Sequence, residues 1–375
     1  MAYDSSKIKY ASSVIPTRTV KEAQQLQFRL TDCMTKHFTG NQFLSLGDLG
    51  VSPSLGKPEQ TDRVERVLAD FFNSEKAALV RGSGTGAIRN ILSQLLKPGD
   101  AMFIHTAPTY TTTTESIRIL GVETRTINYN LLDEVKEALI KDKGCKVFYV
   151  QHARQQPQDT YDLKQLIALV KKIRPDLPIV VDDNYLALKA YGIGVEYGAD
   201  YSTFSGFKVL GPEGIGVVVG KKEGIQQLND RNYSGGGQVQ GYEAMELLRM
   251  MTFAPVASAT QNEVVEDVCQ QLNEGMIEGV DRAYMVNAQS KVIIVELKEP
   301  IAQKVIKQSN ELGAATHPVG AESKYEIIPM IYRVSSSFIA ADPKMKDYGI
   351  RINPMKSGSY TVLRLLKEAI QSAAN

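Results

Sequence analysis

The fold class of this chain is decided by the stretch Ala77-Ala78-Leu79-Val80-Arg81-Gly82-Ser83-Gly84-Thr85-Gly86. Its four leading apolar residues are typical of a short buried strand, and its glycines predict a tight turn. The following residues, 87–96, have apolar side chains at helical spacing, and Lys97-Pro98-Gly99 then indicates a helix end. A strand, a glycine turn and a helix are therefore predicted in succession.

Apolar runs and helical patterns continue to alternate on the C-terminal side of this stretch. Further strands are predicted at 101–104, 122–127, 147–150, 179–181, 201–204 and 215–219, and helices at 131–141 and 163–173. Strands that alternate with helices are typical of an α/β fold, with a mostly parallel sheet covered by helices on both faces.

The chain is predicted to have three parts. Residues 1–50 form an N-terminal arm and helix, and residues 51–245 form the large domain. Residues 246–375 form a smaller C-terminal α/β domain, which the N-terminal segment partly completes. The smaller domain is predicted from helical patterns at 261–273, 301–312 and 361–373 and from strands at 292–297 and 350–353.

Composition and charge argue against several classes of protein. The 375 residues carry 43 Lys and Arg against 42 Asp and Glu, and this balance is not that of a general nucleic-acid binder. No apolar run approaches the roughly 18 residues that span a bilayer, and the N-terminus lacks the features of a signal peptide. The three cysteines are scattered. We therefore expect a cytoplasmic protein with no nucleic-acid or membrane partner.

Ligands of open α/β sheets bind beyond the carboxyl ends of the strands, so the residues after each apolar run are candidate site residues. At the glycine turn, N–H groups at a helix N-terminus favour an anion, which makes Gly84, Thr85 and Gly86 phosphate-binding candidates. The alternative is a tight turn without a ligand. The turn lacks the lysine of nucleotide-binding phosphate loops and is one residue shorter than the dinucleotide fingerprint.

Two further strand ends carry side chains that could contact a ligand. Tyr110, after the run 101–104, could stack on a ring, and packing against the protein is the alternative. Gln151 and His152, after the run 147–150, could form hydrogen bonds to a ligand. The alternative for His152 is a histidine whose hydrogen bonds are satisfied inside the protein.

Asp182, Asp183 and Lys208 are charged residues at the ends of apolar runs. Two adjacent carboxylates at the end of a buried strand are costly unless a cation or a hydrogen-bond donor meets them. A metal ion would need further ligands, none of which lies close in sequence, whereas a protonated ring nitrogen would serve equally well. A buried lysine has a lowered pKa and can attack an aldehyde, and a surface lysine is the alternative.

These features together match pyridoxal 5′-phosphate (PLP): a phosphate cradle, an aromatic platform, a carboxylate for a ring nitrogen and a lysine for an aldehyde. A nicotinamide cofactor, as in an oxidoreductase, would leave Lys208 and Asp182 unexplained. The sequence therefore predicts PLP as the cofactor and no metal site.

From about residue 60 to its C-terminus, the chain resembles the fold-type I PLP enzymes of the aspartate aminotransferase superfamily. The segment Gly235-Gly236-Gly237-Gln238 is similar to one in the class V branch. Over nearly its whole length, the chain closely resembles the YhfS-like family. The segments that carry this likeness are Gly47-Asp48-Leu49-Gly50, Gln155-Gln156-Pro157-Gln158-Asp159, Gly211-Pro212-Glu213-Gly214 and Ala321-Glu322-Ser323-Lys324-Tyr325-Glu326-Ile327. The resemblance implies a seven-stranded type of sheet in the large domain.

The resemblance also implies a role for each candidate residue at the cofactor. Lys208 matches the lysine that forms the Schiff base, and Asp182 matches the aspartate that pairs with the pyridine nitrogen. Tyr185, three residues after Asp182, matches a tyrosine that contacts the 3′-oxygen. His152 or Gln151 falls near the residue that contacts this oxygen from the other side.

For the remaining positions, the resemblance implies contacts with phosphate, ring, substrate and partner. Ser205 matches a serine that helps hold the phosphate, and Tyr110 lies where an aromatic residue stacks on the ring. Arg351 matches an arginine for the substrate carboxylate, with Arg333 and Arg154 as rivals. A homodimer is implied as well, and the loop that would reach the partner includes Gly236, Gly237 and Gln238.

The expected function is that of a PLP-dependent enzyme, aminotransferase-like, that acts on an amino acid or a related amine. Lys208 would release the cofactor to the substrate and then act as general base at the α-carbon. One alternative is a Cα/β-γ lyase of the Cys/Met-metabolism type. Another is a fold-type I scaffold with a binding or regulatory role. Cys269 lies in an apolar helical pattern and is expected in the core, so no desulfurase nucleophile is predicted.

Overall fold

The computed structural model describes residues 14–153, 156, 158–232, 237–288, 290–317 and 322–374. The chain forms two compact units. The large unit contains residues 22–152 and 161–255, and the small unit contains the described residues of 1–21, 153–160 and 256–375. The predicted domain boundaries at residues 50 and 245 stay a prediction.

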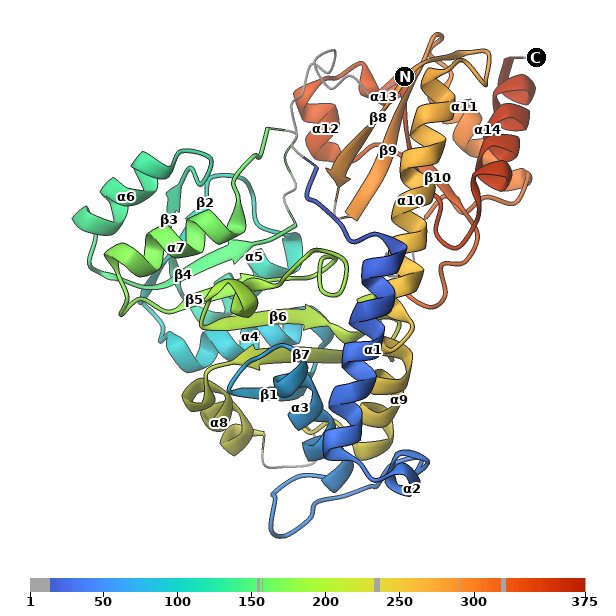
Figure 1. Cartoon of the computed structure of the whole chain (residues 1–375). Helices are drawn as coiled ribbons and strands as arrows, with labels where there is room; N and C mark the ends of the chain where they lie inside the picture. The colour runs from blue at the N-terminus through green and yellow to red at the C-terminus, as the bar shows by residue number, and fades with distance from the viewer. Residues whose placement is uncertain are drawn as a thin grey trace. The chain divides into compact units, whose positions relative to one another are not determined.

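The large unit is built on a seven-stranded sheet with the order β1-β7-β6-β5-β4-β2-β3 (Figure 1). Strands β2 to β6 are parallel to one another, whereas β7 runs antiparallel to both β6 and β1. The predicted α/β class with a mostly parallel sheet is therefore confirmed. The strands are β1 (Lys76–Arg81), β2 (Ala101–His105), β3 (Glu123–Ile127), β4 (Cys145–Gln151), β5 (Ile179–Asp182), β6 (Tyr201–Ser205) and β7 (Ile215–Gly220).

Helices cover both faces of this sheet because their apolar residues lie on one side at helical spacing. The core on one face joins the sheet to α4, α5 and α8, and the core on the other face joins it to α6 and α7. The helices are α1 (Val20–His37), α2 (Gly40–Phe43), α3 (Glu59–Phe71), α4 (Ser83–Leu95), α5 (Thr111–Leu120), α6 (Leu132–Lys141), α7 (Leu163–Ile173), α8 (Lys222–Arg231) and α9 (Gly241–Met251).

The small unit contains a four-stranded antiparallel sheet with the order β10-β11-β9-β8. Helices α10, α11 and α14 pack on one face, and α12 and α13 pack on the other. Its elements are α10 (Ala254–Asn273), β8 (Val280–Ala288), β9 (Ser290–Leu297), α11 (Ala302–Glu311), β10 (Met330–Arg333), α12 (Ser336–Ala341), α13 (Met345–Tyr348), β11 (Gly349–Asn353) and α14 (Ser359–Ala374). No helix in the described part of the chain is both long and apolar enough to cross a bilayer.

Two of the elements that the sequence did not predict, α5 and β8, have local reasons for being missed. Helix α5 begins with four threonines, and β-branched residues have low helix propensity. Strand β8 carries Asp281, Arg282 and Asn287, which interrupt the apolar pattern. Its pairing with β9 along nearly its whole length stabilises it all the same.

Parallel register brings the ends of β4, β5 and β6 together at one edge of the large sheet. Gln151 at the end of β4 pairs with Asp182 at the end of β5, and Asp182 in turn pairs with Thr203 in β6. The candidate residues of these three strands therefore lie side by side.

Candidate active site

The glycine turn and the start of α4 form a cup of polar groups together with the end of β6. The hydroxyl groups of Ser83 and Ser205 are 2.5 Å apart. The N–H of Ser83 donates to the carbonyl of Gly214 (3.1 Å), and that of Gly86 donates to the carbonyl of Gly82 (2.7 Å). The remaining N–H groups of this first helical turn belong to residues 84 and 85, and helix geometry gives them no intrahelical acceptor.

Other parts of the chain come very close to Gly84 and Gly86, so an added side chain at either position would force a neighbour to move. A Cβ at Gly84 would lie 2.5 Å from the side-chain amide of Asn184. A Cβ at Gly86 would lie 2.0 Å from the carbonyl oxygen of Arg81. The structure thus gives Gly86 a packing role with its N–H already used, and its contact with phosphate stays a prediction.

Asp182 lies at the end of β5 and is almost fully buried. Its Oδ1 accepts hydrogen bonds from the backbone N–H of Asn184 (3.0 Å) and from Asn184 Nδ2 (2.7 Å), and its Oδ2 accepts one from the Tyr149 hydroxyl (3.2 Å). Burial raises the pKa of Asp182, while the donors from Asn184 and the nearby Lys208 ammonium lower it. This carboxylate is well suited to meet a cationic ring nitrogen.

Lys208 lies in a short 3-10 helix, Gly206–Val209, directly after β6. The side chain is half-buried, and Nζ lies 4.5 Å from the centroid of the Tyr185 ring. Ser83, Tyr185 and Leu210 have φ values of 58°, 70° and 67° in the left-handed region. Such conformations cost about 1–3 kcal/mol each for residues other than glycine, and they cluster at functional sites. The chain around Lys208 is strained in the way that binding sites often are.

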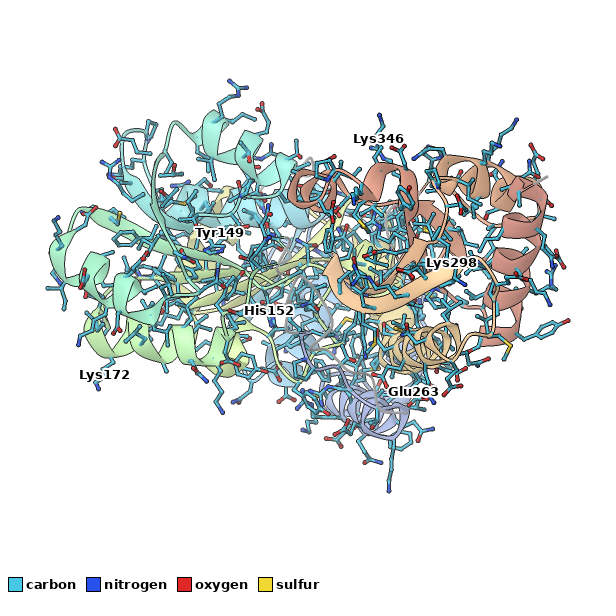
Figure 2. The ribbon with its side chains drawn as sticks, turned by 90° about the horizontal axis from the view of Figure 1, so that it is seen from above. Tyr149, His152, Lys172, Glu263, Lys298 and Lys346 are labelled. Atoms are coloured by element: carbon cyan, nitrogen blue, oxygen red, sulfur yellow. The ribbon has the colours of Figure 1, made fainter. Side chains whose placement is uncertain are left out.

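Tyr110 and His152 lie in different surroundings. Tyr110 is about one-third exposed at the start of α5, and its N–H donates to Oε1 of Gln151 (3.1 Å). Nδ1 of His152 lies 2.7 Å from Oδ1 of the fully buried Asp183. The other carboxylate oxygen of Asp183, Oδ2, accepts a hydrogen bond from the N–H of Gly194 (3.1 Å). Figure 2 shows His152 and Tyr149 inside the outline of the large unit, whereas Lys172 extends outward from its edge. One ring nitrogen of His152 is thus used within the protein.

Arg351 belongs to the small unit, in β11, where its guanidinium lies 4.1 Å from the centroid of the Tyr332 ring. It is buried, and its Nε has no hydrogen-bond partner among the described residues. Its rival Arg333 is exposed at the end of β10, and the other rival, Arg154, lies outside the described residues.

The predicted partner loop is described only in part, because Gly236 lies outside the described residues. Gly237 approaches the side chain of Asn232 within the same unit. Gln238 is buried and donates from Nε2 to the carbonyl of Gly56, while its own carbonyl accepts from Arg81 (3.2 Å). The reach of this loop toward a second subunit stays a prediction.

Three residues of the site were not singled out from the sequence: Ser83, Tyr149 and Asn184. Ser83 lies inside the glycine turn, and Asn184 follows Asp182 and Asp183, so their positions could have indicated them. Tyr149 lies in an apolar run, and no local signal distinguishes it from core residues.

These residues fit PLP. The helix N-terminus and the two hydroxyls suit a phosphate, the buried Asp182 suits a ring nitrogen, and Lys208 provides the amine beside it. The close approach of Asn184 to Gly84 leaves no room for a side chain at the floor of the cup.

Known proteins resemble this chain over most of its length. It is 48% identical over 354 residues to the uncharacterized protein YhfS of Escherichia coli (strain K12), covering 94% of this chain and 97% of that protein. The crystal structure of the PLP-dependent protein YhfS from E. coli has a TM-score of 0.94 and 46% identity, covering 96% and 99% of the two chains. Cystathionine gamma-lyase from yeast has a TM-score of 0.68 and 18% identity, covering 92% and 98%, and it therefore shows the fold alone.

Two family patterns match the chain. The pattern of the Cys/Met metabolism PLP-dependent enzymes matches residues 55–275, and that of the YhfS-like C-terminal domain matches residues 266–366. The class V subtype suggested by the segment Gly235-Gly236-Gly237-Gln238 is not confirmed by these matches. From the site and from these matches together, the chain belongs to the Cys/Met metabolism family of PLP-dependent enzymes and has a YhfS-like C-terminal domain.

Proposed function

We propose that this protein is a lyase that removes a substituent from the β- or γ-carbon of an amino acid. The observation that carries the proposal is that the half-buried Lys208, the buried Asp182 and the cup at the start of α4 lie in one site. The sequence alone placed aminotransferase chemistry first, and the match to the Cys/Met metabolism family favours the elimination alternative.

The cofactor would be held at its two ends by different groups. The N–H groups of Gly84 and Thr85 and the hydroxyls of Ser83 and Ser205 would bind the phosphate. Asp182 would pair with the ring nitrogen. When bound, the cofactor supplies an electron sink for negative charge that develops at the substrate α-carbon.

Lys208 would move the proton that starts the reaction. In this proposal its amine takes the α-proton of the substrate, and the electron pair left at the α-carbon then expels a β-substituent with its bonding electrons. For a γ-substituent, a proton would also have to leave the β-carbon before the bond at the γ-carbon breaks. Tyr185 lies against the amine and would limit the directions in which Nζ can move. Tyr110, at the start of α5, would cover one face of the ring.

Arg351 would bind the substrate carboxylate through its guanidinium. The variant Arg351→Gln is expected to raise KM for the amino acid and leave cofactor affinity unchanged. Arg364→Gln is the control, because Arg364 is exposed in the same unit and pairs only with Glu368 among its described contacts (3.0 Å). Equal KM values for wild type and Arg351→Gln would exclude this role.

The reaction is tested with amino acids that carry a sulfur substituent at the β- or γ-carbon. The proposal expects ammonia, a 2-oxo acid and the released thiol, with turnover at least about 100-fold lower in Lys208→Ala. Borohydride treatment followed by peptide mass spectrometry should place the cofactor mass on Lys208. Pyridoxamine phosphate with a 2-oxo acid but no ammonia would establish the aminotransferase reaction instead. A holo-protein with no product would favour a binding role.

A second copy of the chain is proposed to dock on residues 44–55. Leu44, Leu46 and Leu49 in this segment are 78%, 80% and 75% exposed. The backbone beneath them is held in place, because Asp48 accepts from the N–H of Glu59 (2.7 Å) and Gln240 accepts from that of Gly50 (2.8 Å). Several large apolar side chains exposed close together in sequence on a fixed backbone favour an interface.

Sedimentation analysis of Leu46→Glu tests this docking. The dimer is expected to dissociate in that variant. A variant that stays dimeric, or a wild type that is monomeric at all concentrations, would contradict the proposed interface. A cytoplasmic location also stays a proposal, supported by three cysteines that are all buried and free of disulfides.

A further inference from the structure

Asn184 contacts three of the chain segments that carry proposed cofactor-binding groups. These segments are the end of β5, the end of β6 and the start of α4. We propose that Asn184 is a positioning residue that fixes the carboxylate of Asp182 relative to the phosphate cup. The inference concerns cofactor binding and holds whether the enzyme eliminates or transaminates.

The side-chain amide of Asn184 bridges two neighbouring strand ends. Its Nδ2 donates to Oδ1 of Asp182 (2.7 Å), and its Oδ1 accepts from the backbone N–H of Ser205 (2.9 Å). Ser205 is the residue whose hydroxyl meets Ser83 in the cup. A single planar group therefore links the carboxylate for the ring nitrogen to the hydroxyls for the phosphate.

The third contact is made by the start of α4. Gly84 comes so close to Asn184 that a Cβ at residue 84 would lie 2.5 Å from both Nδ2 and Oδ1. The amide is thus held by hydrogen bonds at both of its polar atoms and by the backbone of α4. A rigid group between two binding sites sets the distance between them.

The side chain at residue 184 must both donate and accept a hydrogen bond, which an amide can do. Asp182 needs a donor and the Ser205 N–H needs an acceptor, and asparagine offers both on a short side chain. A carboxylate at residue 184 would repel Asp182 and offer it no donor. The backbone N–H of Asn184 also donates to Asp182, so the residue supports Oδ1 twice.

Tyr149 provides a matched comparison. It is buried and donates to the other carboxylate oxygen of Asp182, Oδ2, at 3.2 Å. Among its described hydrogen bonds, none goes to the phosphate cup. Tyr149→Phe should therefore perturb Asp182 without a direct effect on the phosphate cup, whereas Asn184→Ala should perturb both ends of the cofactor site.

The test uses PLP bound to the full-length enzyme and two signals that do not depend on turnover. The 31P chemical shift reports the phosphate end, and the 15N shift of ring-labelled PLP reports the nitrogen end. Asn184→Ala is expected to move both signals and to weaken PLP binding at least about tenfold, as expected for a lost hydrogen bond to a charged group. Tyr149→Phe is expected to move the 15N signal only.

Asn184→Ser keeps a small donor and acceptor and serves if the alanine variant fails to fold. It should shift both signals in the same directions, by less. An unchanged 31P signal in a folded Asn184 variant would overturn the proposal. An equal 31P change in Tyr149→Phe would overturn it too, because the phosphate end would then respond to any disturbance of Asp182. Loss of the lyase reaction alone would leave both signals as in wild type.

Discussion

Replacing Gly84 by alanine should distort the cofactor site through one added methyl group. The new Cβ would lie 2.5 Å from Nδ2 and Oδ1 of Asn184 and 2.9 Å from its Cγ. Contacts this short do not persist, so the Asn184 amide must move. Because Nδ2 donates to Asp182 (2.7 Å) and Oδ1 accepts from Ser205 (2.9 Å), the movement breaks or weakens both hydrogen bonds.

Two effects of opposite sign determine how far Gly84→Ala changes the free energy of unfolding. Gly84 lies inside the first turn of α4, where alanine is favoured over glycine by about 1 kcal/mol. Overpacking costs about 1–3 kcal/mol, and a lost hydrogen bond to a charged group costs about 1.5–3 kcal/mol. These two costs are alternatives, because moving the amide relieves the clash. With the amide moved and the hydrogen bond lost, the net loss in the free energy of unfolding of the apoenzyme should be about 0.5–2 kcal/mol.

Urea unfolding followed by circular dichroism measures this loss, and fluorescence titration with PLP measures cofactor affinity in parallel. Gly40→Ala is the control, because Gly40 opens α2 and has nothing within 4 Å of the added Cβ. The control should be neutral or stabilising. A Gly84→Ala variant that is more stable than wild type and binds PLP with the same affinity would contradict this prediction. It would show that the added methyl group does not displace the Asn184 amide.

Two further predictions concern buried charges. Lys57→Met should destabilise the protein by about 3–5 kcal/mol at neutral pH, because it leaves the buried carboxylate of Glu65 without its ion-pair partner. Burial already raises the pKa of Glu65. The loss should shrink as the pH falls and Glu65 becomes neutral, whereas Arg118→Met, at an exposed ion pair, should change nothing measurable in the same denaturation series. Asp182→Asn should lower PLP retention in gel filtration and yet keep or raise apoenzyme stability at neutral pH. Burial raises the pKa of Asp182, so the stability of wild-type apoenzyme falls as the pH rises through that raised pKa, and the variant should lack this slope. Apoenzyme stability that is lower in Asp182→Asn at every pH would contradict this reasoning.

Most of the large unit could be predicted from local sequence patterns. Strands and helices between residues 76 and 220 repeat an apolar signal that depends on neighbours in the chain, and the structure confirms each predicted strand within about two residues. Helix α5 and strand β8 could not be predicted in this way, because threonines and charged residues mask their periodicity.

The chemistry of the site was only partly readable. A glycine turn, paired aspartates and a lysine each stand at a strand end, and that order was sufficient to predict the cofactor. The sequence pattern could not show that the two aspartates have different partners. In the structure, Asp182 accepts a hydrogen bond from Tyr149, whereas Asp183 pairs with His152. Both partners lie about thirty residues earlier in the chain.

The sequence by itself determined the α/β class, the PLP cofactor and the strand ends that carry the candidate residues, because these depend on periodicity and on residue type. Only the tertiary structure decided which side chains meet. Ser83 reaches Ser205 across 122 residues, and Gly84 packs against Asn184 from a different strand end. Such contacts arise when strands far apart in the chain lie side by side in one sheet, and the apolar pattern of one strand does not say which strand will be its neighbour.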